Sequence, residues 1–323
     1  MTGHENNLSH LRIGLDIGGT NIEALAVDPS FNVVGKFSRA THADTPEHLV
    51  ASAVDAIQQV LAEAQVTPRH LNSIGIGVPG LVETETGIVR LAANLNLTAY
   101  PLGAVITQTF GVPTFLENDV RLAAIGVYRW LQEREITANM AYLSIGTGVS
   151  AGVVLNGRLH RGSHGMAGEI GHITVEPNGA LCNCGARGCL ETIIAGPAIV
   201  KQARGQVSFA VADHEVHAGH VYQAARQGNP AAQKIIKRVG DYMARAVQYL
   251  IMTYDVDKVI VGGGVTAAGA AFLTPLFTGL AKLRQQSDLF DTMLSENKLC
   301  LLPQDYNAGT WGAVYLPDEL HQH

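Results

Sequence analysis

The chain has 323 residues, of which 47% are hydrophobic and 15% charged, and it contains 35 glycines. This composition is typical of a globular, turn-rich α/β protein with a large core, and the length suggests two domains. A formal net charge of −6 argues against a nucleic-acid surface, which needs clustered Lys and Arg to neutralise phosphates. No apolar run approaches the ~20 residues that cross a bilayer, and the polar first ten residues lack a signal-peptide core. We therefore expect a cytoplasmic protein that binds neither nucleic acid nor membrane.

The first part of the chain alternates between strand-like and helical patterns. Hydrophobic periodicity and turn residues predict the following elements. They are two strands joined by a Gly-Gly turn (11–28), a third strand (31–38), a helix (46–65), strands at 73–80 and 87–95, a helix (101–111), a strand (113–119), and a helix from about Asp119 to Trp130.

A second cycle opens at residues 140–160, again as a strand, a Gly-Thr-Gly turn and a strand, which indicates an internal duplication. The later elements are a long amphipathic helix (231–254), a strand into a glycine turn (258–265), a helix (267–286), a strand around Cys300 and a closing segment (309–316). No low-complexity linker separates the halves, so we expect two closely packed α/β domains with a cleft between them. The predicted domains are residues 1–118, completed by about 306–323, and residues 119–305.

Residues 168–191, GEIGHITVEPNGALCNCGARGCLE, contain three of the four cysteines. Cys182, Cys184 and Cys189 follow His172, and three thiolates with one imidazole form the ligand set of a closed tetrahedral zinc site. Carboxylates flank this set at Glu169 and Glu191. We therefore expect a structural zinc ion that folds a loop whose edges face a polar ligand.

Other interpretations of these cysteines are a redox pair or a loop without metal. Cys182 and Cys184 are separated by one residue, too close for an unstrained disulfide. The fourth cysteine, Cys300, lies in an apolar run and is predicted to be a core residue.

Three glycine-rich turns follow predicted strands, and glycine lets backbone N–H groups approach an anion closely. They are Gly18-Gly19-Thr20, Gly146-Thr147-Gly148 and Gly262-Gly263-Gly264. The first two stand at matching places in the duplicated halves, where they could grip a polyphosphate from both sides. Asp16, at the end of its strand, is placed to hold Mg²⁺ directly or through water.

Two nucleotide-binding motifs are excluded by their context. Residues 75–80, GIGVPG, fit G-x-G-x-x-G, but Pro79 and the following residues do not open a helix as a dinucleotide-binding motif requires. The chain contains no G-x-x-x-x-G-K-[ST] motif.

Asn118 and Asp119 stand where a predicted strand ends and a helix begins. One interpretation is a helix N-cap. The other is a functional site, because strand carboxyl ends at a domain junction are where α/β proteins build their sites.

These motifs occur in an order that resembles the bacterial sugar kinases of the repressor–ORF–kinase (ROK) family. The segments are DIGGT, END, IGTGVSAGVVLNGRLHRGSHGMAGEIGH, CNCGARGCLE and VIVGGGV, and the resemblance runs from about Ile13 to Val314. It implies a two-domain, actin-like ATPase fold of the ribonuclease H-like type that closes over a sugar and ATP. The cysteine loop with its preceding GEIGH is highly specific to that family.

The resemblance also implies roles for individual residues. Asp119 would be the base that takes a proton from a sugar hydroxyl, and His172 would bind both zinc and sugar. The residues implied to bind or line the sugar site are Gly80, Asn94, Asn118, Glu169, His172 and Glu191. The DIGGT turn and Gly146 to Gly148 would hold the ATP phosphates, with Gly262 to Gly264 near the nucleoside.

This chain departs from the family pattern at several positions. Asn21 stands where many relatives carry Lys, and Arg121 replaces a small or amide residue. Val127 stands where Glu is frequent, Ser150 replaces Gly, and Tyr254-Asp255 lies near a usual Asp-Pro pair. None of these removes a proposed catalytic group, but they bear on which sugar is preferred.

The predicted activity is ATP-dependent phosphorylation of a hexose, with glucose as the default substrate. N-acetylhexosamine or fructose kinases are the nearest alternatives, and a homo-oligomer, either a dimer or a tetramer, is implied by family relatives. A sugar-responsive repressor would need a DNA-binding module, and about eleven residues precede the first predicted strand. A catalytically silent sugar sensor is disfavoured because Asp119 is retained.

Overall fold

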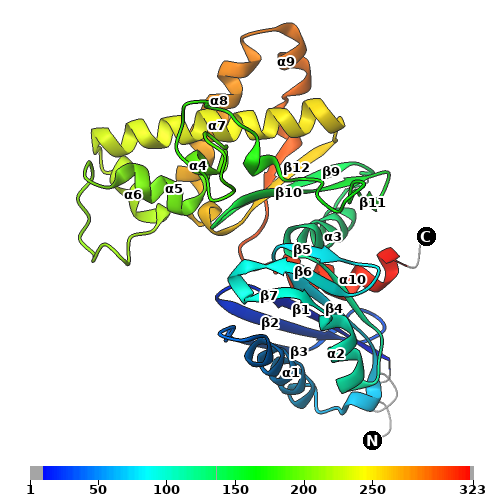
Figure 1. Ribbon diagram of the computed structural model, residues 1–323. Helices are drawn as coiled ribbons and strands as arrows, with labels where there is room; N and C mark the ends of the chain where they lie inside the picture. The colour runs from blue at the N-terminus through cyan, green and yellow to red at the C-terminus, as the bar shows by residue number, and fades with distance from the viewer. Residues whose placement is uncertain (1–9, 136, 321–323) are drawn as a thin grey trace, which may run out of the picture. The chain divides into compact units, whose positions relative to one another are not determined.

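The computed structural model describes residues 10–135 and 137–320, which form two compact units. Unit one comprises residues up to 135 with 158–167 and 307–320, and unit two comprises 137–157 and 168–306. Figure 1 shows the helices and strands of both units.

Unit one contains a five-stranded sheet in the order β3-β2-β1-β4-β8 and a three-stranded sheet, β5-β6-β7. Its strands are β1 Leu11–Ile17, β2 Asn21–Val27, β3 Val33–Ala40, β4 Leu71–Val78, β5 Leu81–Glu83, β6 Ile88–Ala92, β7 Leu97–Tyr100, β8 Thr114–Asn118 and β11 Arg158–Leu159. Its helices are α1 Pro46–Glu63, α2 Leu102–Phe110, α3 Asp119–Gln132 and α10 Ala308–Leu320.

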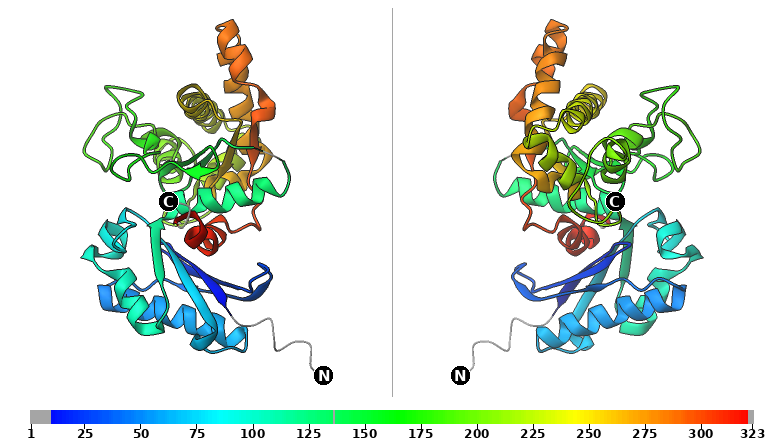
Figure 2. Two further views of the ribbon diagram at one scale, coloured as in Figure 1. Left: turned by 90° about the vertical axis from the view of Figure 1, so that its right-hand side faces the viewer. Right: turned by 90° about the vertical axis from the view of Figure 1, so that its left-hand side faces the viewer.

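The two faces of the larger sheet carry different helices (Figure 2). Alternate residues of β1, such as Ile13 and Leu15, are fully buried in a core shared with α1 and α2. On the other face, Gly14 and Gly75 lie against α10. A Cβ on Gly75 would stand 1.9 Å from the Ala313 carbonyl oxygen, so glycine is required for α10 to pack this closely.

In unit two, strands β10, β9, β12 and β13 are neighbours in that order. Its strands are β9 Met140–Ile145, β10 Val149–Leu155, β12 Lys258–Gly262 and β13 Leu299–Leu301, and its helices are α4 Glu191–Ile194, α5 Gly196–Ala203, α6 Ala218–Arg226, α7 Pro230–Tyr254, α8 Ala270–Arg284 and α9 Asp288–Met293. These helices supply one large hydrophobic core with the inner residues of the sheet, such as Leu143 and Val261. The close crossing of α7 and α8 depends on Gly240 and Gly279, where an added Cβ would meet the opposite helix.

The sheets confirm the predicted internal duplication. In each, the first strand pairs antiparallel with the second across a glycine-rich turn and parallel with a later strand, which in turn pairs parallel with a fourth. Strands β1, β2, β4 and β8 therefore correspond to β9, β10, β12 and β13.

The division into units differs from the predicted boundary at residue 118. Helix α3 belongs to unit one because it packs against α10, where Gly312 lies directly against the Leu122 carbonyl. Residues 158–167 also belong to unit one, although they interrupt unit two in the sequence. We call this segment the excursion.

Two other predictions from the sequence concern Cys300 and membrane-spanning helices. Cys300 lies on a strand, as predicted, but is half-buried and not a full core residue. Within the described ranges, no helix combines the length and the apolar character that a membrane span requires.

Candidate active site and metal centre

In unit one, Asp16, predicted to hold Mg²⁺, and Asp119, the predicted base, lie near the carboxyl ends of neighbouring parallel strands. Asp16 of β1 pairs in register with Gly77 of β4, and Gly77 pairs with Glu117 of β8. A Cβ on Gly77 would lie 3.2 Å from Asp16 Oδ1 and 3.7 Å from Asp119 Cα. Asp16 and Asp119 thus both lie beside Gly77 at one edge of the sheet, where an added Cβ would also meet Leu122 Cδ2 at 2.5 Å.

Asn118 is the N-cap of α3. Its Oδ1 accepts from the backbone N–H groups of Val120 at 3.1 Å and Arg121 at 3.2 Å, and its Nδ2 donates to the Gly80 carbonyl at 3.1 Å. Asn118 therefore performs the capping role that the sequence left open, and Asp119 is the first helical residue. This last bond joins Asn118 to Gly80, two of the residues predicted to line the sugar site.

Both acidic residues at this edge have raised pKa values. Burial is the main cause of the raised pKa of Asp119, opposed by a hydrogen bond from the Val120 N–H and by the charge of Arg121. Burial, with the nearby charges of Asp119 and Glu23, raises the pKa of Asp16 to about 7. A divalent cation would relieve this repulsion, so the cluster fits the predicted magnesium role of Asp16.

Asp16 should make the ligand-free protein less stable as pH rises. Its folded-state pKa of about 7 exceeds the ordinary value of 3.8, so the folded protein keeps a proton that the unfolded chain releases. Stability from Asp16 is therefore lost between about pH 4 and pH 7 and is constant above that range. Asp16→Asn should raise the melting temperature by a few degrees at pH 8 without divalent cations, and leave it near that of the wild type at pH 4.

Thermal unfolding at the two pH values checks this expectation. Asp44→Asn is the control, because the Asp44 side chain is 84% exposed. Equal stabilisation at both pH values would show that the charge of Asp16 is not the cause.

The first glycine turn lies at the tip of the β1–β2 hairpin. The Gly18 N–H donates to the Asn21 carbonyl at 2.9 Å, and the Thr41 hydroxyl donates to the Gly18 carbonyl at 2.7 Å. Gly19 and Thr20 are exposed. Asn94 lies beside the tip, 3.8 Å from where a Cβ on Gly19 would stand.

In unit two, Glu191 lies against the second glycine turn. Its Oε2 accepts from the Val149 N–H at 3.0 Å, and a Cβ on Gly148 would stand 2.7 Å from the same oxygen. Its other oxygen, Oε1, lies 3.9 Å from Cys182 Sγ. Glu191 therefore connects the glycine turn with the cysteine loop.

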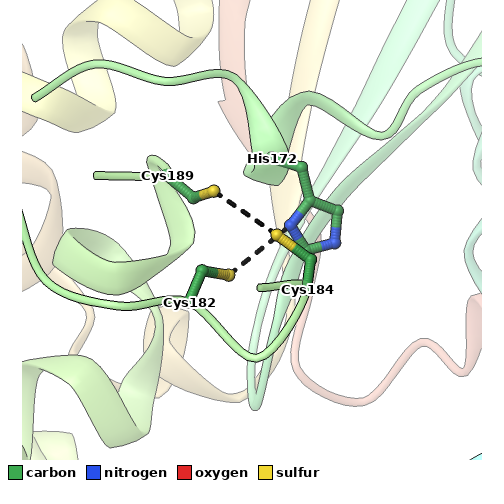
Figure 3. Close-up of side chains that lie close together, drawn as sticks. All are labelled: His172, Cys182, Cys184 and Cys189. Carbon is green, nitrogen blue, oxygen red and sulfur yellow. Dashed lines mark hydrogen bonds between the residues drawn. The ribbon is translucent and has the colours of Figure 1, made fainter. Parts of the chain in front are cut away.

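The structure brings the four predicted zinc ligands together (Figure 3). The ligand atoms of His172, Cys182, Cys184 and Cys189 all lie within 4.8 Å of one another. Cys184 Sγ lies 3.7 Å from Cys189 Sγ, and Cys182 Sγ lies 3.7 Å from His172 Nδ1. Zinc–sulfur bonds of ~2.3 Å place tetrahedral ligands ~3.8 Å apart, so this donor set fits a structural zinc ion.

The cysteines differ in how readily they lose a proton. A hydrogen bond from the Ala186 backbone is the main cause that lowers the pKa of Cys184, whereas burial raises the pKa of Cys189 to about 12. Zinc binds thiolates, so metal binding at this set releases protons. Glu169 precedes the short 3-10 helix Ile170–His172, and its carbonyl accepts from the His172 N–H at 3.1 Å.

The third glycine turn shares a pocket with the second. Gly146, Thr147 and Gly264 line a pocket of about 850 Å³ in unit two, and no atom would obstruct a Cβ on Gly264. Gly263 has a φ of +91° and lies against the Ile145 carbonyl, a position that only glycine fills without strain. The same pocket is lined by Lys201, Arg204 and His217, which offer cationic or polar groups and which no sequence motif had indicated.

Four of the five departures from the family pattern have defined local environments, and nothing in the structure explains Asn21. The Ser150 hydroxyl donates to the Gly168 carbonyl at 3.2 Å, and Val127 is fully buried in α3. Asp255 has a φ of +48° and ends α7 in the left-handed conformation. Arg121 is 3% exposed and bonds Glu117, a residue that the sequence analysis also missed.

The duplicated sheets, the paired glycine turns and the carboxylates at the strand ends define a mixed α/β protein with the actin-like ATPase fold. The family model described as "ROK family" matches residues 12–316, so the chain belongs to the ROK family. This confirms the resemblance seen in the sequence.

Several ROK proteins are similar to this chain. A glucokinase of Halalkalibacterium halodurans is 33% identical over 82% of this chain and 83% of its own length. A xylose repressor of Caldicellulosiruptor bescii is 30% identical over 82% of this chain and 68% of its own. An N-acetylmannosamine kinase of Vibrio vulnificus is 35% identical over 79% of this chain and 83% of its own.

Among solved structures, a ROK family glucokinase from Streptomyces griseus in complex with glucose and AMPPNP is similar to this chain. It has a TM-score of 0.75 and 30% identity, covering 95% of this chain and 98% of its own.

Proposed function

We propose that this protein is an ATP-dependent sugar kinase that transfers the γ-phosphoryl group to a hexose hydroxyl, with glucose as the leading substrate. The observation that carries the proposal is the placement of Asp119. It lies partly buried at the first turn of α3, at the same sheet edge as Asp16 and directly after the Asn118 cap. Membership of a family that includes glucokinases supports the same activity.

In this proposal Asp119 acts as a general base. The sugar hydroxyl gives its proton to the Asp119 carboxylate while its oxygen forms a bond to the γ-phosphorus, and the bond from that phosphorus to the ADP oxygen breaks. A positioned base contributes ~10²–10⁴-fold to such a step. Most of the remaining acceleration in phosphoryl transfer comes from positioning and charge neutralisation.

Polar groups would hold the hexose. In unit one these are Asn118 and Asn94 with the backbone of Gly80, and in unit two they are Glu169, His172 and Glu191. One N–H of the Asn118 amide is committed to Gly80, which leaves the second to donate to a sugar oxygen. His172 Nδ1 approaches Cys182, so Nε2 is the ring nitrogen proposed to reach the sugar.

The nucleotide would bind the glycine turns. Backbone N–H groups at Gly18 to Thr20 and Gly146 to Gly148 would face the phosphates, and the pocket beside Gly262 to Gly264 would take the nucleoside. Asp16 would hold Mg²⁺, which neutralises phosphate charge when bound. The zinc ion would be structural and hold the loop that carries His172.

The nearest alternative is an N-acetylhexosamine kinase, which the similarity to an N-acetylmannosamine kinase supports, with fructokinase as a further alternative. A sugar-responsive regulator without catalysis is a remote alternative that the relative named as a xylose repressor keeps open. A homo-oligomeric state, a dimer or a tetramer, also stays a proposal that light scattering tests.

A coupled ADP-release assay with glucose, mannose, fructose, N-acetylglucosamine and N-acetylmannosamine tests the proposed function. We expect the highest kcat/KM with glucose, and no ADP release without sugar or divalent cation. Preference for an N-acetylated sugar would replace glucose by the alternative substrate. Sugar binding without ADP release from any of the five would refute the kinase proposal and favour a sensor.

A further inference from the structure

A buried ionic cluster surrounds the segment that carries Asp119. Its centre is Glu117, which is fully buried at the end of β8. Glu117 Oε1 accepts from Arg121 Nε at 2.9 Å and from the Asn118 N–H at 2.9 Å. Its Oε2 accepts from Arg161 Nε at 2.7 Å, so two arginines bind one carboxylate.

Arg121 has a second acceptor, which links α3 to the excursion. Its Nη1 donates to the Gly165 carbonyl at 2.6 Å, while its Nε is bonded to Glu117. Arg161, the other partner of Glu117, lies in the excursion as well, and Ala167 closes a turn by donating to the Arg161 carbonyl. Arg121 and Glu117 therefore fasten residues 158–167 to the first turn of α3.

The cluster brackets Asp119 in the sequence. Glu117 precedes it by two residues, Arg121 follows it by two, and the Arg121 N–H is one of the two donors to the Asn118 cap. Two residues after Ala167 the chain reaches Glu169, a proposed sugar ligand. The anchored excursion is thus followed closely in the chain by Glu169, another residue of the proposed sugar site.

Stability alone is a poor account of this arrangement. Transferring the charges of Glu117 and Arg121 from water into the interior costs about as much free energy as their attraction returns, and apolar replacements of such pairs are often as stable. Position is a better account, because a planar guanidinium bonded to two acceptors has little freedom, whereas a displacement of ~1 Å at a reacting group can cost ~10²-fold in rate.

We propose that Arg121 is a positioning residue for the phosphoryl transfer proposed above, acting by bridging Glu117 and the Gly165 carbonyl so that Asp119 is held in its reactive position. The inference rests on the proposed function. Arg121 is buried, and the proposal gives it no contact with sugar or nucleotide. It would change kcat only by holding Asp119 in place.

A double-mutant cycle with Arg121→Met and Asp119→Asn tests this proposal. Met keeps an unbranched side chain that reaches about as far as the Arg Nε, but it bonds neither acceptor. We expect Arg121→Met to lower kcat ~10-fold or more when Asp119 is present and less than ~2-fold in the Asp119→Asn background. Equal fold losses in both backgrounds would overturn the proposal, since a merely structural defect acts independently of Asp119.

Two further variants separate position from general stability. Arg121→Lys keeps the charge, but one ammonium lacks the planar fork that spans both acceptors, so its kcat should fall between those of wild type and Arg121→Met. Wild-type kcat in Arg121→Lys would overturn the bridging role. Arg129→Met is the matched control: Arg129 lies on the same helix, ~12 Å further along it, and packs over the Tyr315 ring. Its kcat should stay within ~2-fold of wild type.

Hydrogen exchange gives a readout that does not depend on turnover. In Arg121→Met, backbone amides of residues 161–167 and of Val120 should exchange faster, while those of β1 and β4 stay protected. Wild-type exchange in both segments would overturn the proposal. Absence of ADP release by the wild-type protein would instead count against the proposed function, and exchange would then decide the role of Arg121.

Discussion

Asp119→Asn should lower kcat by ~10²-fold or more while hexose affinity stays largely intact. Asn keeps the size of the side chain and its hydrogen bond from the Val120 N–H, but it cannot accept the proton of the sugar hydroxyl. Steady-state ADP release and calorimetric titration of the hexose measure the two quantities separately.

The pH dependence of the wild-type rate should follow the same carboxylate. Burial raises the pKa of Asp119 above its ordinary value of 3.8, and only the ionised form can act as a base. The rate should therefore rise as pH increases through the raised pKa of Asp119. The pH–rate profile of Asp119→Asn should lack this rise.

A matched control is available in α9. Asp288, like Asp119, is the first residue of a helix whose preceding residue, here Ser287, caps it through its side chain. Asp288→Asn should leave kcat unchanged, because only the helix-terminal charge is lost. Near-normal turnover of Asp119→Asn would remove Asp119 from the role of base, and loss of hexose binding would indicate a structural role instead.

Purified protein should contain about one zinc ion per chain, and Cys184→Ala should lose both the zinc and most of the hexose affinity. Cys184 is exposed, so its removal leaves no cavity in the core, and the effect reports the metal bond. His172, freed from the metal, would lose the orientation that its proposed sugar contact requires. Elemental analysis and calorimetry measure the two losses.

The variant should still fold, because the base of the loop has a second anchor. Glu176 accepts two hydrogen bonds from Arg238, at 2.6 and 2.7 Å, and one from the Tyr242 hydroxyl at 2.7 Å. These bonds lower the pKa of Glu176, so the anchor stays ionised near neutral pH. Cys300→Ala, which removes the one cysteine outside the cluster, is the control and should retain zinc. Full activity in protein without zinc would contradict a structural metal.

Most elements of the fold were predictable because their signals are local. The helical spacing over 46–65 and the glycine turns after β1 and β9 depend on residues close in sequence, and the structure places α1 and both hairpins there. The zinc ligands were also found, since Cys182, Cys184 and Cys189 lie within eight residues and their chemistry is distinctive.

Contacts between distant segments could not be predicted in this way. The assignment of α3 to unit one depends on its packing against α10, almost 190 residues later. Arg121 could be recognised as unusual, but its acceptor Gly165 and the second arginine on Glu117, Arg161, both lie in the excursion, whose proximity to α3 is a property of the folded chain. The basic groups beside Gly264 were missed for the same reason.

The packing of α10 on Gly14 and Gly75 has a consequence for how the protein is made. The sheet synthesised first presents these two bare backbone positions to a helix that follows all of unit two in the sequence, so one face of this sheet stays uncovered while unit two is synthesised. Unit two, whose residues end at 306, has all its strands before α10 emerges from the ribosome. Folding in the cell should therefore finish at the amino-terminal sheet, once α10 has emerged, and a chain stopped at residue 306 would leave that sheet open on one side.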